Sequence, residues 1–82
     1  MFRAMKNGER LDEEQIATLA KKFRQAAGKS QLDAAHELRV SKPAISQAEN
    51  QPEKSFFKLR KRMIEKYSPF KVIGPGYWLE RK

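Results

Sequence analysis

The chain has 82 residues with 18 Lys and Arg against 10 Asp and Glu, no cysteine and a formal net charge of +8. This length allows one small domain with a marginal core, and the lack of cysteine excludes disulfides, thiolate metal ligands and cysteine nucleophiles. No apolar run is long enough for a membrane span and no signal-peptide core is visible, so we expect a soluble cytoplasmic protein. The positive charge favours a polyanionic partner.

Residues 1–11 carry little apolar content and are expected to form an N-terminal tail. A helix should follow, because Asp12 can cap it, Gln15 can complete a capping box, and Leu11 can pack on Ile16. The apolar positions with helical period in this segment are Ile16, Leu19, Ala20, Phe23 and Ala27. Gly28 predicts the end of the helix.

Two short helices are predicted between residues 31 and 50. Ser30 can cap the first with Asp33 in the box position, and Ser41 can cap the second, with Pro43 in its first turn. The small and apolar residues expected to face inward are Leu32, Ala35, Leu38, Val40, Ile45 and Ala48. A methyl group at Ala35 is what a close crossing of the two helices would require.

A loop over residues 50–55 should lead to a fourth helix that begins near Glu53 or Ser55. Its expected apolar stripe is formed by Phe56, Phe57, Leu59, Met63, Ile64 and Tyr67, with Lys54, Lys58, Lys61 and Arg62 on much of the remainder. Two β-favouring runs then flank Gly74, Pro75 and Gly76, which predicts a C-terminal hairpin or strand pair in residues 69–82.

The segment Gln31 to Asn50 resembles the helix-turn-helix of phage Cro and repressor proteins and their bacterial relatives. Gln31, Ala35, Ile45 and Asn50 fill the places where that family commonly has Gln, Ala, Ile or Val, and Asn. Arg39 departs from the pattern, because the family usually has Gly at the turn, and a left-handed Arg costs roughly 1 kcal/mol. The resemblance implies a mainly α, four-helix DNA-binding domain over residues 12–68.

The outward positions of the second motif helix divide by chemistry. Lys42 can donate to guanine, Gln47 can pair with adenine, and Pro43 or Ala44 can touch a thymine methyl group. Ser41 and Ser46 could serve bases or phosphates. For Lys42, contact with the DNA backbone alone is an equal alternative.

Phosphate contacts are expected from four further residues. The resemblance implies this role for Gln31 and Asn50, and we assign a backbone brace to Lys54 and Lys58 because they follow the recognition helix in sequence. The lone His36 has no metal-ligand constellation around it, and the scattered glycines make no phosphate loop. We therefore expect neither a cofactor nor an enzyme.

The predicted function is sequence-specific double-stranded DNA binding by a repressor-like transcriptional regulator that acts as a dimer on an operator. Relatives of this shape also serve as antitoxins that autoregulate their operon with a toxin partner. A third alternative is a protein-interaction module that uses Tyr77 and Trp78 of an exposed C-terminal strand.

Overall fold

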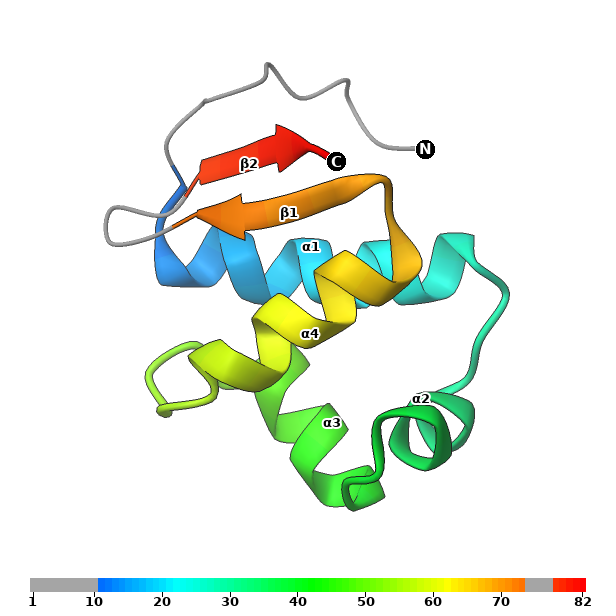
Figure 1. The fold of residues 1–82 in the computed structure, drawn as a ribbon. Coiled ribbons are helices and arrows are strands. Elements are labelled where there is room, and N and C mark those ends of the chain that lie inside the picture. Colours follow the sequence, from blue (N-terminus) through cyan, green and yellow to red (C-terminus); the bar gives the residue numbers. More distant parts are fainter. Residues whose placement is uncertain (1–10, 74–77) are drawn as a thin grey trace.

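The computed structural model describes residues 11–73 and 78–82 as four helices followed by a two-stranded antiparallel sheet (Figure 1). The elements are α1 (Glu13–Ala26), α2 (Gln31–Leu38), α3 (Lys42–Asn50), α4 (Phe57–Tyr67), β1 (Phe70–Ile73) and β2 (Trp78–Arg81). This confirms the mainly helical fold with a C-terminal strand pair. The predicted tail, apart from Leu11, and the Gly-Pro-Gly turn with Tyr77 lie outside the described residues.

The first three helices begin at the capping residues predicted from the sequence. The Asp12 carboxylate accepts from the Gln15 amide at 2.8 Å, and the Gln15 side chain accepts from the Asp12 amide at 2.9 Å. Ser30 and Asp33 form the same reciprocal box at the start of α2. At the start of α3 the Ser41 hydroxyl accepts from the Ala44 amide. Each cap satisfies backbone donors that the first turn of a helix leaves unpaired.

The end of α1 differs in one detail from the expectation. Gly28 adopts a left-handed conformation (φ 74°) that ends the helix as predicted. Ala27, however, is exposed and serves as the C-cap rather than as a core residue. The reason is that the helix has already ended at Ala26, so the helical period no longer sets the direction of the next side chain.

The core lies between α1 and α4, which pack chiefly against each other, and α2 and α3 close it at the bottom of Figure 1. Ala35, Leu38, Ile45 and Ala48 are buried as predicted. Leu32 was also predicted to face inward, and this is wrong: 50% of its surface is exposed, and Ala34 is buried instead. Ala34, Ala35 and Leu38 form the inner face of this short helix, and Leu32 points away from it.

The fourth helix begins at Phe57, later than the predicted start at Glu53 or Ser55. Residues 51–56 instead form turns in which the Lys54 amide donates to the Gln51 carbonyl and the Phe56 amide to the Lys54 carbonyl. No side chain caps the helix. The predicted stripe is otherwise confirmed: Leu59, Met63 and Ile64 are buried, and Phe56, Phe57 and Tyr67 pack partly buried against the core.

The two strands form a hairpin with Val72 opposite Leu79 and Ile73 opposite Trp78. Val72 and Leu79 are buried and turn toward the helices. Only 1% of Leu79 is exposed, so this residue packs inside the fold and is not available to a second subunit. Since side chains alternate along a strand, Lys71, Ile73, Trp78 and Glu80 lie on the outer face of the hairpin.

Candidate nucleic-acid interface

The two helices of the motif meet in a tight turn. The chain reverses over residues 39–41, with Arg39 in the left-handed region at φ 59° and ψ 48°. Its amide and that of Val40 donate to carbonyls in the last turn of α2. Ala34 and Ala35, which are 0% and 2% exposed, leave room for α3 to pack closely across α2. The close crossing predicted at Ala35 is therefore present, and Arg39 adopts the conformation for which glycine is usually needed.

The third helix has an anchored face and an outward face. Ile45, Ala48 and Glu49 are buried. The predicted reading positions occupy the rest of the helix and its cap: Ser41, Lys42 and Pro43 are exposed, and Ala44, Ser46 and Gln47 are half-buried. All of these side chains are small or polar. A ligand that approaches this face meets hydrogen-bonding groups rather than bulky apolar ones.

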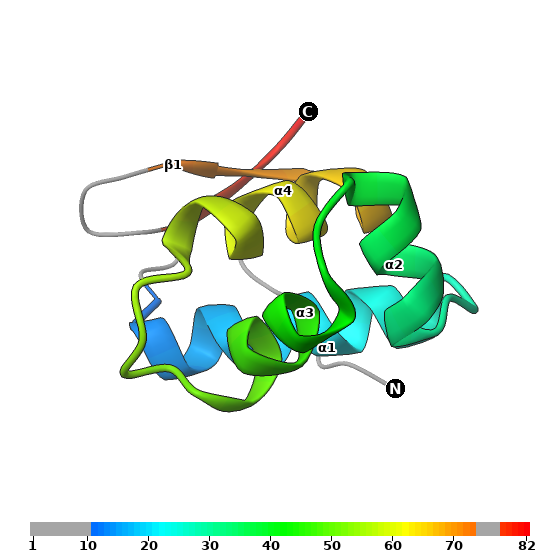
Figure 2. The ribbon, with the colours of Figure 1, turned by 90° about the horizontal axis from the view of Figure 1, so that it is seen from below.

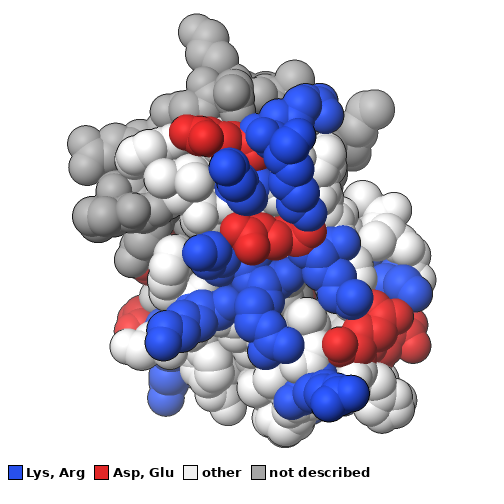
Figure 3. Space-filling view, viewed as in Figure 1, with Lys and Arg blue, Asp and Glu red and all other residues white. Residues whose placement is uncertain are grey.

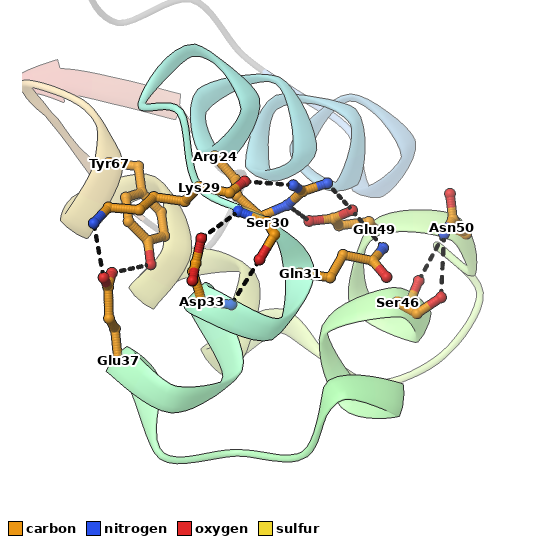
Figure 4. Close-up of polar contacts among 10 residues, drawn as sticks. All are labelled: Arg24, Lys29, Ser30, Gln31, Asp33, Glu37, Ser46, Glu49, Asn50 and Tyr67. Atoms are coloured by element: carbon orange, nitrogen blue, oxygen red, sulfur yellow. Dashed lines mark hydrogen bonds and ion pairs between the residues drawn. The ribbon is translucent and has the colours of Figure 1, made fainter.

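A buried ion pair fixes α3 to α1. Arg24 Nε lies 2.5 Å from Glu49 Oε2, and Arg24 Nη2 donates to Glu49 Oε1 at 3.0 Å (Figure 4). The two side chains are 7% and 0% exposed. Arg24 Nη1 also donates to the Lys29 carbonyl at 2.7 Å. The bidentate geometry matches the planar guanidinium to both carboxylate oxygens.

The Gln31 side chain joins this cluster. Its Nε2 donates to Glu49 Oε1 at 3.1 Å, so the amide points along the protein surface toward α3 (Figure 4). An amide nitrogen carries two hydrogens, so one N–H remains for a phosphate. Asn50 Nδ2 donates to the Ser46 carbonyl at 3.0 Å and, over a longer distance of 3.5 Å, to the Ser46 hydroxyl. The two side chains predicted to contact phosphates are thus already held in place, Gln31 by Glu49 and Asn50 by Ser46, at the two ends of the interface.

A second buried arginine holds the C-terminal end of α3. Arg60 is fully buried, and its Nε and Nη2 donate to the carbonyls of Ala48 (2.8 Å) and Gln51 (2.7 Å). Its Nη1 bonds to the Glu13 carboxylate at 3.1 Å. The cation thereby satisfies carbonyls that a helix end leaves unpaired and complements the helix dipole.

The predicted brace residues lie beside this end. Lys54 is in the loop after α3 and Lys58 is in the first turn of α4, and both are exposed. Within residues 11–73 and 78–82, no carboxylate lies within ion-pair distance of either ammonium group. Their charge is therefore available to an anionic ligand.

A polar network ties the other end of the motif to α4. The Tyr67 hydroxyl donates to Glu37 Oε1 at 2.6 Å, and Lys29 Nζ lies 2.9 Å from Glu37 Oε2 (Figure 4). The hydrogen bond from Tyr67, reinforced by Lys29, lowers the pKa of Glu37. Burial and the bond to Glu37 together raise the pKa of Tyr67. The network positions the C-terminal turn of α2 against α4.

Sequence reasoning did not identify Arg24, Glu49 or Arg60 as structural residues. A usable signal was present, because Arg24 follows Ile16 and Ala20 at four-residue intervals, and Glu49 follows Ile45 by four. Arg60 similarly precedes Ile64 by four residues. A charged residue in register with an apolar stripe predicts a buried, paired charge.

No group of three or more potential metal ligands occurs among the described residues, and His36 is exposed. None of the helices in that part of the chain has the length and apolar character needed to cross a bilayer. Comparisons of the chain with protein-family models, curated proteins and solved structures found no match.

Proposed function

We propose that this chain is a sequence-specific double-stranded DNA-binding protein in which α2, the turn and α3 form a helix-turn-helix of the Cro/repressor type. The observation that carries the proposal is the two-faced character of α3. Its inner face is held by Ile45, Ala48 and the Arg24–Glu49 pair, and its outer face offers small and polar side chains. A helix that reads base edges in the major groove needs this combination of rigid support and free donors and acceptors.

The proposed readers are Gln47 and Lys42. A Gln side chain can bond to N6 and N7 of adenine, and a Lys can donate to O6 and N7 of guanine. Gln31 would flank them at a phosphate through its remaining N–H, and Asn50 at another by exchanging its long bond to the Ser46 hydroxyl for a phosphate oxygen, with Lys54 and Lys58 alongside. Occupation of an operator in this way would make the protein a repressor-like transcriptional regulator.

The test begins with selection of binding sites from a randomised duplex library. On a selected duplex, Gln47→Ala and Lys42→Ala should each weaken binding by about 1 to 3 kcal/mol, and on a scrambled duplex much less. Lys22→Ala on the exposed side of α1 serves as the control. Equal weakening of both duplexes by Gln47→Ala would show that Gln47 does not read bases.

We further propose that the protein acts as a homodimer through the end of its hairpin that carries Ile73 and Trp78. Ile73 and Trp78 face each other across the strands and are half-buried, so a partner could still cover them. Two-fold pairing would set two recognition helices about 34 Å apart, and the selected sites should be palindromic. Sedimentation equilibrium of the full chain and of Trp78→Glu tests this. A monomeric full chain that protects a single unrepeated half-site would contradict it.

A further inference from the structure

The positive charge of the chain is concentrated away from the candidate recognition helix. Residues 11–52 contain six Lys and Arg and six Asp and Glu, so they have no net charge. Residues 53–82 contain nine Lys and Arg against three Glu, a net charge of +6. The two motif helices, residues 31–50, carry two Arg and Lys against three acidic residues. The attraction to a polyanion therefore arises mainly from α4 and the hairpin.

These charges gather on one face of the molecule. Figure 3 shows Lys and Arg side chains over α4 and the hairpin in a single view. The basic face, as we call it, includes Lys61 and Lys66 of α4 and Lys71 of β1. Within the described ranges, no carboxylate lies at ion-pair distance from any of these three lysines.

The two acidic residues within this face are already engaged in the fold. Glu65 Oε2 accepts from the Val72 amide at 3.0 Å, and Glu80 Oε2 accepts from Trp78 Nε1 at 2.9 Å. The Glu65 carbonyl also accepts from the Lys82 ammonium group. The Glu65 carboxylate holds β1 on α4, the Glu80 carboxylate bonds within β2, and neither forms an ion pair with the lysines. The face is thus a set of cations without an ion-pair partner among the described residues, with Lys66 and Lys71 exposed and Lys61 half-buried, on a rigid support.

The face points in a different direction from the outward side of α3. In Figure 1, α2 and α3 lie at the bottom of the molecule, and α4 lies in front of α1. Figure 2, seen from below, shows α4 and α1 on opposite sides. A straight duplex seated under α3 would therefore leave most of the basic face open to another ligand.

We propose that the basic face is a second, sequence-independent DNA surface, which binds the phosphate backbone of a segment other than the one under α3. From Lys61 to Lys66 the helix rises about 7.5 Å, which matches about two nucleotides of one strand. Solubility alone does not require such asymmetry, since residues 11–52 are neutral. An acidic protein is a poorer fit, because stable protein interfaces need apolar anchors. The one large apolar residue exposed in the described part of the chain is Leu32, on α2, and half-buried Ile73 and Trp78 are assigned to the homodimer contact.

The test compares two variants that each remove two positive charges. Lys61→Gln/Lys71→Gln alters the basic face, and Lys21→Gln/Lys22→Gln is the matched control on α1. Each is titrated with a scrambled 30-base-pair duplex across salt concentrations. The face variant should lower the magnitude of the salt slope by about two, since each phosphate contact contributes about 0.9. The control should change it by well under one unit. Lys66→Gln/Lys71→Gln provides a second face variant if the first does not fold.

A bridging assay then asks whether two segments bind at once. A bead-bound scrambled duplex should co-capture a fluorescent one with the wild-type protein and the control, and several-fold less with the face variant. Lys42→Ala/Gln47→Ala should still co-capture, so failure of base reading by α3 would leave this result intact.

Three results would overturn the proposal. If the face variant and the control lowered the magnitude of the salt slope equally, the salt dependence of binding would reflect only the net charge of the protein. An unchanged slope in the face variant would mean that these lysines contact no phosphate. If the face variant keeps its duplex slope but loses binding to a polyglutamate peptide, the surface serves an acidic protein instead.

Discussion

Replacing Glu49 by glutamine is expected to remove a large part of the stability of this domain. The Glu49 carboxylate is fully buried and accepts three hydrogen bonds, two from Arg24 and one from Gln31. Glutamine has the same shape but one acceptor oxygen, and its NH₂ group would face donors. Arg24 would keep its buried charge without a counter-ion.

The size of the effect follows from this geometry. Breaking a buried ion pair by removing one charge costs about 3 to 5 kcal/mol, and we expect about 3 because one acceptor remains. A chain of this length has a total stability of roughly 4 to 12 kcal/mol. The variant should therefore have an unfolding equilibrium constant larger by a factor of about 100 to 200. At the low end of the range it would be partly unfolded at room temperature.

Urea denaturation followed by circular dichroism measures this change. Arg24→Met/Glu49→Leu is the informative control, because replacing both charges with apolar groups avoids an unpaired ion and should recover most of the lost stability. A loss below about 1 kcal/mol for Glu49→Gln, or a double variant less stable than the single one, would refute the reasoning that the pair is desolvated and mutually dependent.

Three further predictions concern the motif and its attachment to α4. Ala35→Leu should cost about 1 to 3 kcal/mol by forcing α2 and α3 apart, and an unchanged thermal midpoint would contradict the close crossing. Arg39→Gly should raise the free energy of unfolding by up to about 1 kcal/mol, and with it the thermal midpoint, because glycine adopts the left-handed conformation without strain; a lower midpoint would argue against this. Tyr67→Phe removes the hydrogen bond that is the largest cause of the lowered Glu37 pKa. The lowered pKa stabilises the fold at pH values above the ordinary pKa of 4.5, and this stabilisation is lost as the pH falls through the pKa of Glu37 in the folded state. The stability difference between Tyr67→Phe and wild type, measured by urea titration, should therefore shrink from about pH 6 to about pH 3, and a constant difference would contradict it.

Local signals predicted the helical elements well. The caps at Asp12, Ser30 and Ser41 were predictable, because each depends only on a side-chain acceptor and the backbone amide three residues later in the chain. The hairpin was predictable from two β-favouring runs around a turn. The start of α4 was not, because it depends on turns in residues 51–56 and on the docking of Arg60 under α3.

The polar connections of the site were harder to predict. Arg24 and Glu49 are 25 residues apart in sequence, so their pairing depends on how α1 and α3 cross. The direction of the Gln31 amide follows from that pairing. Leu32 was misplaced for a related reason, because in a helix of 8 residues two different faces can satisfy the helical period. Only the neighbouring helices decide which face is buried.

The burial of Arg60 has a consequence for how any groove would accommodate α3. Its guanidinium fastens the last turn of that helix to α4 and to Glu13, while the pair at Glu49 fastens the same helix to α1. A helix clamped at these points has little freedom to tilt or slide toward a ligand, so it would lose little conformational entropy on association. Adjustment would then fall to the DNA. Sites whose base steps bend or twist easily would be favoured even where no side chain touches them, and flexible pyrimidine–purine steps should be enriched between the half-sites of selected duplexes.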